Sequence, residues 1–314
     1  MPSTDALLAL PAGLTSRPLT TADATAVYTV MALEESHDLG EVVIEEADIV
    51  ADWQHPGFDV GSSTVGVFDE DRLVGYAEVS VGERGDAAVH PAYRGRGIGT
   101  ALAGWMQQRA ADLGRATIGM PVPQGSPGDR LLEALGYHVR WESWVLQLPE
   151  GREVPQRPLP PGYAVRAATV QEYPLCHRVV EDAFLEWSSR PRETVEEWGS
   201  RTIRRPGFQP WMMRVAVEPG GAVVGVALVL LADEGTEGFV EQLAVRADQR
   251  GRGLAQALLV DAFEQARGHG ARRSSLSTDS RTGALSLYEK VGMVVTSTWV
   301  HRAIGLTGLT GLTG

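Results

Sequence analysis

The sequence contains a single cysteine, Cys176, and a single lysine, Lys290, among its 314 residues. One cysteine cannot form a disulfide within the chain, and this indicates a protein of a reducing compartment, the cytoplasm. We expect Cys176 to be a small core residue on a helix, because free cysteine is among the most buried residue types.

Long apolar runs and an excess of positive charge are also absent. No run approaches the roughly 20 apolar residues of a membrane span, and the first residues, MPSTDALLALPAGL, lack the basic start of a cleaved signal. Aspartate and glutamate number 40 against 28 for lysine and arginine, which gives a formal net charge of −12. Nucleic-acid binding requires a positive field, so the sequence predicts neither a membrane nor a nucleic-acid partner.

What the sequence does contain is an internal repeat. The run YRGRGIGTAL at 93–102 returns as QRGRGLAQAL at 249–258, and Gly136 returns as Gly292. Both pairs are separated by 156 positions (249 − 93 and 292 − 136). Since the chain is also about twice the length of a usual domain, we interpret it as a duplication with two domains.

The boundaries of the two copies follow from composition. Residues 149–162, PEGREVPQRPLPPG, are rich in proline and polar side chains and are typical of an extended linker. We therefore expect an N-terminal domain over 1–149, a linker over 150–161 and a C-terminal domain over 162–305. The Gly-Leu-Thr repeat over 306–314 predicts a low-complexity tail outside the fold.

Both copies show the same order of expected elements. A short strand, helical segments and two further strands precede a strand that ends at Val89 or Val245. The glycine run, a helix, a strand, a short helix and a final strand pair follow. This order predicts an α/β (α+β) protein, in which each copy has a sheet flanked by helices.

Each glycine run lies between a strand and a helix, which favours binding of an anion. Glycines let the backbone approach a ligand closely, and the helix N-terminus adds a partial positive charge. A P-loop needs Gly-Lys-Ser or Gly-Lys-Thr, which neither run has. A dinucleotide fingerprint needs a third glycine where the runs have Thr100 and Gln256. A tight structural turn is the remaining alternative.

Both runs resemble motif A of the GNAT superfamily of N-acetyltransferases, Gln/Arg-x-x-Gly-x-Gly/Ala, at residues 94–99 and, with the permitted alanine, at 250–255. The resemblance implies two tandem GNAT folds, each a mixed, mostly antiparallel twisted sheet flanked by helices. It also implies acetyl-CoA as the cosubstrate, with its pyrophosphate at the loop, and no metal. The residues that it places at acyl-CoA are Val89, Arg94, Gly95, Arg96, Gly97, Ile98 and Gly99 in the first copy, and Leu243, Ala244, Val245, Arg250, Gly251, Arg252, Gly253, Leu254 and Ala255 in the second.

A carboxylate on the strand before the second run is the candidate base. Strand alternation places Glu241, Leu243 and Val245 on one face. A carboxylate in a largely apolar strand is costly unless it has a role or a partner. In many GNAT enzymes a glutamate nine residues before the motif A arginine deprotonates the amine, so the resemblance implies that Glu241 is the general base. The alternative is an edge carboxylate paired with an arginine.

A tyrosine in the second copy is the candidate acid. The segment Ala284–Met293 resembles the family's Ala-x-x-Leu-Tyr-Glu-x-x-Gly-Phe segment, whose tyrosine commonly protonates the leaving thiolate. The resemblance implies this role for Tyr288, and a core aromatic on an amphipathic helix is the alternative. The usual asparagine upstream is missing, since this chain has Asp279-Ser280-Arg281 there.

The first copy lacks both groups. At the offset of 156, Glu241 falls on Gly85 and Tyr288 on Leu132. Asp86 lies one residue later, which alternation sends to the other face. We therefore expect the chemistry in the second copy, while the first binds acyl-CoA without turnover or holds an empty remnant.

The acceptor is expected to be a small-molecule amine. In this family the acceptor lies against the first two helices and the final strands, where the second copy has Phe184, Trp187 and Trp211 together with several glutamates. Aromatic side chains with carboxylates would suit a cationic amine. The alternative is that the tryptophans fill the core and the glutamates lie on a solvated helix face.

Two copies with an impaired first one resemble the tandem GNAT enzymes of the mycothiol synthase type, which acetylate a cysteinyl amine. That amine is one candidate acceptor. A non-catalytic acyl-CoA-binding sensor is an alternative of another class, although the presence of Glu241 and Tyr288 together favours an enzyme. We expect a monomer or a homodimer.

Overall fold

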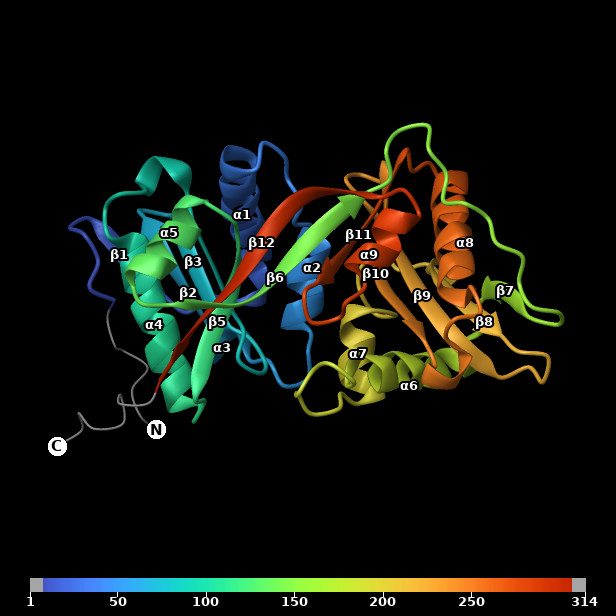
Figure 1. Cartoon of the computed structure of the whole chain (residues 1–314). Helices are drawn as coiled ribbons and strands as arrows, with labels where there is room; N and C mark the ends of the chain where they lie inside the picture. Colours follow the sequence, from blue (N-terminus) through green and yellow to red (C-terminus); the bar gives the residue numbers. More distant parts are fainter. Residues whose placement is uncertain (1–7, 307–314) are drawn as a thin grey trace. The chain divides into compact units, whose positions relative to one another are not determined.

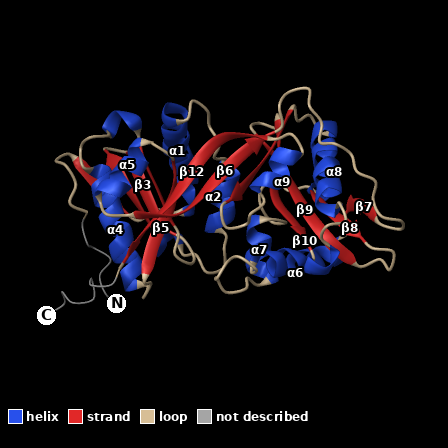
Figure 2. Ribbon diagram, in the orientation of Figure 1, coloured by secondary structure: helices blue, strands red, loops and turns tan. Residues whose placement is uncertain are grey.

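The computed structural model describes residues 8–306, which form two compact units (Figure 1). The first unit takes the chain up to Glu142 together with the residues from Trp299 on, and the second takes Ser143–Thr298. Each unit has a sheet with helices packed against it, so the predicted α/β fold class is confirmed (Figure 2). Among the described residues, no helix has the length and apolar character needed to cross a membrane.

The first unit is built on a four-stranded antiparallel sheet in the order β1-β2-β3-β4. Val74 of β3 belongs to the core beneath α4, whereas its neighbour Leu73 belongs to the core beneath α1. Helices therefore cover both faces of this sheet. The elements are β1 (Leu14–Arg17), α1 (Ala24–Asp38), α2 (Glu46–Trp53), α3 (Val60–Ser63), β2 (Thr64–Asp69), β3 (Arg72–Val79), β4 (Gly85–Val89), α4 (Ile98–Asp112), β5 (Thr117–Pro123) and α5 (Pro127–Ala134).

The second unit repeats this layering. Ala227 and Val229 of β9 pack beneath α8, and Val226 and Leu228 pack beneath α6 on the other face. Cys176 of α6 is fully buried, as expected, and burial raises the pKa of its thiol to about 12. The elements are β7 (Ala164–Ala167), α6 (Tyr173–Phe184), α7 (Val195–Arg201), β8 (Met213–Val217), β9 (Val223–Ala232), β10 (Glu237–Val245), α8 (Leu254–Gly268), β11 (Arg273–Asp279) and α9 (Leu285–Lys290).

A single long strand ends each copy, where the sequence predicts a strand pair. These strands are β6 (His138–Gln147) and β12 (Val294–Gly305). Neither contains an internal glycine, proline or asparagine, so no turn divides it. The last part of β6, Ser143–Gln147, pairs with β11 inside the second unit, whereas Trp299–Gly305 of β12 pairs with β5 inside the first. The two copies thus exchange the last segments of their final strands.

The segment expected as a linker, 150–161, has neither helix nor strand but packs on the second unit. Val154 is 5% exposed and belongs to the core beneath α8. The carbonyl oxygen of Pro155 accepts a hydrogen bond from the side chain of Gln256 on α8. The two compact units therefore do not divide at this segment. The boundaries at 149 and 162 stay a prediction about where the first copy ends and the second begins.

The end of β12 is anchored in the first unit by a buried charge. The Arg302 guanidinium pairs with Asp129 of α5 at 2.5 Å and donates to the carbonyl oxygen of Tyr137 at 3.1 Å. Arg302 and Asp129 are 8% and 7% exposed. Of the expected tail, Leu306 is buried in the same unit, and residues 307–314 lie outside the described residues.

We predict that Arg302→Ala lowers the free energy of unfolding by roughly 3–5 kcal/mol, because it leaves the buried Asp129 carboxylate without its partner. Urea denaturation followed by circular dichroism measures this loss. The control is Arg192→Ala, which removes an exposed ion pair with Asp182 and should cost less than about 1 kcal/mol. Equal losses in the two variants would contradict the anchoring role of Arg302.

Candidate active site

The candidate site opens at an irregularity in β10. The parallel pairing of β10 with β11 ends at Val240, which lies opposite Leu276. On its other edge β10 stays paired with β9, but Glu241 is an extra residue, because Val240 and Gln242 lie opposite consecutive residues of β9. Such a β-bulge bends its strand and is common next to active sites. Beyond it, a cavity of about 620 Å³ is lined by both β10 and β11.

The glycine run before α8 forms one part of this cavity. Gly251 and Gly253 have φ angles of +75° and +82°, in the left-handed region that favours glycine. Gly253 precedes the first residue of α8, Leu254, and the first N–H groups of a helix have no acceptor within it. Gly251, Gly253 and Leu254 line the cavity, so the backbone N–H groups at the start of α8 can donate hydrogen bonds to an anion there.

The motif arginine Arg250 holds this loop in place. Its two terminal nitrogens donate to the carboxylate of Glu186 at 2.6 and 2.7 Å, and its Nε donates to the carbonyl oxygen of Val245 at 3.1 Å. These hydrogen bonds from Arg250 hold the pKa of Glu186 below its usual value. Arg250 therefore ties the loop to the end of β10 and to the chain after α6.

Glu241 and Tyr288 line the same cavity. The side chain of Gln242, next to Glu241, turns to the opposite face of β10, where its amide oxygen accepts from Trp198 Nε1 at 3.1 Å. Tyr288 lies on α9 and is 8% exposed. Burial raises its pKa to about 12, so the phenol is protonated at neutral pH and can donate a proton.

Two of the three aromatic residues predicted at the acceptor line the cavity. Phe184 and Trp187 do so, with ring centroids 5.4 Å apart, and the Arg281 guanidinium lies 4.8 Å from the Trp187 ring. Trp211 does not line it, since its ring stacks on His269 at 3.8 Å. The structure thus brings the first two, but not the third, to the candidate site.

Sequence reasoning missed several lining residues. Arg157, from the expected linker, lies at the glycine run, and its segment has no periodicity that would reveal this. Ser277 and Thr278 line the cavity from β11, and the run of consecutive polar residues after Leu276 was the available signal.

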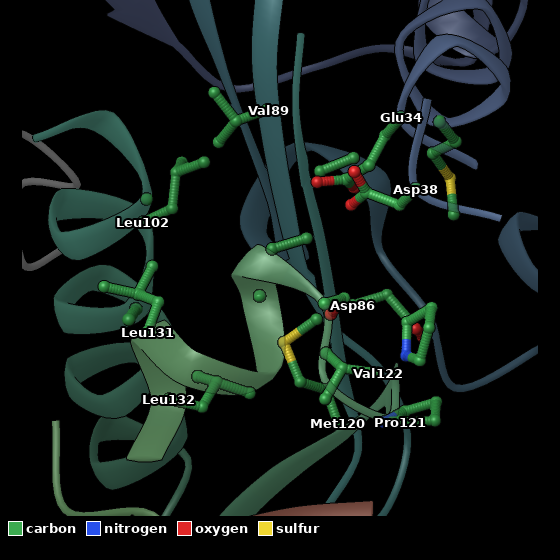
Figure 3. Close-up of a pocket in the computed structure, with 18 of the residues that line it drawn as sticks. Glu34, Asp38, Asp86, Val89, Leu102, Met120, Pro121, Val122, Leu131 and Leu132 are labelled. Atoms are coloured by element: carbon green, nitrogen blue, oxygen red, sulfur yellow. The ribbon is translucent and has the colours of Figure 1, made fainter. Parts of the chain in front are cut away.

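The corresponding cavity of the first unit is smaller, about 200 Å³. Figure 3 shows Glu34 and Asp38 on one side of it and the leucines Leu102, Leu131 and Leu132 on the other. Leu132 thus lies where the repeat places the counterpart of Tyr288. The acidic residues are not free, because Arg94 donates to both oxygens of Asp38, at 2.7 and 2.8 Å, and to Glu34 at 2.8 Å.

The first unit also lacks the bulge. The pairing of β3 with β4 runs from Val89 back to Gly85 without a shift in register. Gly85 lies opposite the fourth residue after Gly75 of β3, and Val240 lies opposite the fourth residue after Gly225 of β9. Matched by these pairings, Gly85 takes the place of Val240, and no residue takes the place of the extra Glu241. Asp86 does line this cavity, and Arg84 Nε donates to its carboxylate at 2.8 Å.

The two glycine runs consequently differ in their relation to a cavity. The first run is held by the ion pairs of Arg94 with Glu34 and Asp38. These pairs are partly buried, and burial raises the pKa of Glu34 to about 7. In the first unit Val89 and Gly99 line the cavity, whereas Arg94, Gly95, Arg96, Gly97 and Ile98 do not. In the second unit Leu243, Ala244, Val245, Arg250, Gly251, Gly253, Leu254 and Ala255 line it, whereas Arg252 does not.

Comparison with known families decides what this arrangement is. The sequence pattern described as "Acetyltransferase (GNAT) family" matches residues 28–137 and 173–293, one stretch in each copy. The chain belongs to the GNAT acetyltransferase family. It is therefore an N-acetyltransferase with two GNAT units, and GNAT acetyltransferases use acetyl-CoA or another acyl-CoA.

Individual GNAT relatives cover most of the chain. A Salinispora arenicola protein named mycothiol acetyltransferase is 31% identical over 251 residues, which are 73% of this chain and 77% of that protein. The crystal structure of a GCN5-related N-acetyltransferase from Sphaerobacter thermophilus is 30% identical, with a TM-score of 0.72, and covers 95% of this chain and 97% of its own. A tandem GNAT protein from the clavulanic acid biosynthesis pathway, 18% identical, shares the fold with a TM-score of 0.69 over 93% and 98% of the two chains.

The described part of the GNAT chain shows no group of three or more histidine, cysteine, aspartate or glutamate side chains that could hold a metal ion. The polar groups at the cavity are instead hydroxyls, carboxylates, two glutamine amides, two arginines and backbone amides.

We predict that Gly253→Val abolishes turnover while Gly97→Val leaves it largely intact. Both glycines precede a helix with positive φ, +82° and +89°, so each substitution should cost about 1–2 kcal/mol of backbone strain. Only the side chain added at Gly253 enters the cavity. Steady-state kinetics with acetyl-CoA and melting temperatures of both variants test this. Loss of turnover in a folded Gly97→Val variant would contradict the assignment of the chemistry to the second unit.

Proposed function

We propose that the second unit transfers the acetyl group of acetyl-CoA to a primary amine of a small molecule. The observation that carries this proposal is one cavity of about 620 Å³ that joins the anion-binding glycine run to Glu241 and Tyr288. The smaller cavity of the first unit has neither of these groups, and of its motif residues 94–99 only Gly99 lines it. We therefore assign no turnover to the first unit.

The residues suit a direct attack of the amine on the thioester. Glu241 accepts a proton from the amine, directly or through water, as the nitrogen bonds to the acetyl carbon. The edge of β10 beyond Val240 is not paired with β11, so backbone N–H groups there can stabilise the oxyanion. The carbon–sulfur bond then breaks, and Tyr288 gives its phenolic proton to the departing thiolate.

The acceptor proposed first is a polar primary amine. The carboxylates of Glu186 and Asp279 at the cavity are paired with Arg250 and Arg281, so they add little net negative charge for a cationic substrate. A cysteinyl amine, as in enzymes of the mycothiol synthase type, is the more specific candidate. The likeness to a protein named mycothiol acetyltransferase, at 31% identity, supports it.

The test is an acetyl-transfer assay with acetyl-CoA and a panel of amines that includes cysteinyl conjugates. Release of CoA thiol gives the rate, and mass spectrometry of the product identifies the acetylated nitrogen. Saturable CoA binding without product from any amine would favour the sensor over the enzyme.

We predict that Glu241→Gln slows the reaction by about 10²–10⁴-fold, with the largest loss at low pH. Without a base only the amine molecules that are already neutral react, and their fraction falls as pH decreases. The pH dependence of kcat/KM measures this. The matched control is Glu237→Gln, on the same strand but outside the cavity. An unchanged pH profile in Glu241→Gln would make Glu241 structural.

We predict that Tyr288→Phe lowers kcat by about two orders of magnitude, while the affinity for CoA and the melting temperature stay nearly unchanged. The substitution removes the hydroxyl and keeps the ring within its core. Burial raises the pKa of Tyr288 to about 12, so the loss of kcat should persist through pH 10. An exposed phenol, with a pKa of about 10, would already be half ionised at that pH.

A ring-fluorinated tyrosine at position 288 separates acid catalysis from positioning. Fluorine lowers the phenol pKa, so the alkaline fall of kcat should move to lower pH if Tyr288 is the acid. Equal kcat in wild type and Tyr288→Phe, or an alkaline limb that fluorination does not move, would return Tyr288 to a packing role.

A further inference from the structure

Residues 154–157, which we call the linker strap, are fixed along α8 beside the candidate site. Val154 is buried in the core beneath α8, and Pro155 accepts a hydrogen bond from Gln256. The side chain of Gln156 donates to Glu264 at 3.2 Å. Three consecutive residues thus hold the strap against the helix, although the segment has no regular secondary structure.

The strap places Arg157 over the glycine run. A Cβ atom added to Gly253 would lie 3.1 Å from Cδ of Arg157 and 3.6 Å from its Cγ. Arg157 also lines the cavity. Its aliphatic stem therefore lies against the glycine that precedes α8, and its Nε would lie 3.7 Å from the same Cβ atom.

The charges around the loop leave Arg157 available to a ligand. Of the described residues that line this cavity, Arg157 and Arg250 are the cations. Arg250 is bound to Glu186 and to the Val245 carbonyl oxygen, as described above. Among residues 8–306 no carboxylate pairs with Arg157.

The position of Arg157 suits an anion bound at the glycine run. The N-terminus of a helix carries a partial positive charge of about half an elementary charge, which disfavours a nearby cation. A phosphate between the two would be attracted by both, and guanidinium groups bind phosphate oxygens through paired, charge-assisted hydrogen bonds.

We infer that Arg157 clamps the pyrophosphate of CoA against the glycine run 250–254, so that the linker strap completes the cosubstrate site. The inference rests on the proposed function of the second unit. In this inference Arg157 of the linker strap is the cation that binds phosphate, whereas the motif arginine Arg250 holds the loop through its hydrogen bonds to Glu186 and Val245.

The test is calorimetric titration of the full chain with CoA and with dephospho-CoA. Arg157→Ala should weaken the binding of both about tenfold, which corresponds to about 1.4 kcal/mol. The Michaelis constant for acetyl-CoA should rise by a similar factor, with kcat at saturation nearly unchanged. Arg157→Lys should recover part of the affinity, because it restores the charge without the paired donors.

The matched control is Arg152→Ala, an exposed arginine of the same segment that does not line the cavity, and it should bind CoA as the wild type does. Equal CoA affinity in wild type and Arg157→Ala would overturn this inference alone. A loss seen with CoA but not with dephospho-CoA would overturn the pyrophosphate assignment in favour of the 3′-phosphate. Failure of the wild type to bind CoA would overturn the proposed function as well.

Discussion

One extra residue in a strand is the constraint on which the rest of the site depends. The bulge at Glu241 lets β10 stay paired with β9 to its end while its pairing with β11 stops at Val240. This opens the sheet between two strands without unfolding either, and the cavity forms there. The same bulge puts a carboxylate into that cavity within a largely apolar strand, and a short turn after the strand leads to the glycine run at the N-terminus of α8.

The two copies show that the same fold can form with this bulge or without it. The first unit keeps the sheet, the glycine run and the helix after it, but β4 has no bulge and its cavity is about a third as large. Leucine replaces tyrosine at position 132, which makes that wall of the cavity apolar. Fold alone therefore does not decide activity, and a few local changes do.

The motif arginines contribute to the shape of the loops more than to free charge. Arg94 is held by Asp38 and Glu34, and Arg250 by Glu186, in each case from the end of the first long helix of the copy or just after it. Each ion pair fixes a glycine-rich turn that has little intrinsic stiffness. This use of the arginines makes a second source of positive charge, on the strap over the second loop, physically reasonable.

The sequence by itself determined the duplication, the order of elements before the final strands, the family and the positions of the two glycine runs, because offsets, periodicity and glycine spacing are local patterns. It also singled out Glu241 and Tyr288, which lie on one cavity, and Trp211, which does not. Only the tertiary structure decided the bulge, the exchange of the last strand segments, the partners of the arginines and the position of Arg157. Each of these depends on contacts between distant residues, such as Arg250 and Glu186, which are 64 positions apart, or Arg302 and Asp129, 173 apart. No local pattern encodes which distant residue completes a strand edge or neutralises a charge.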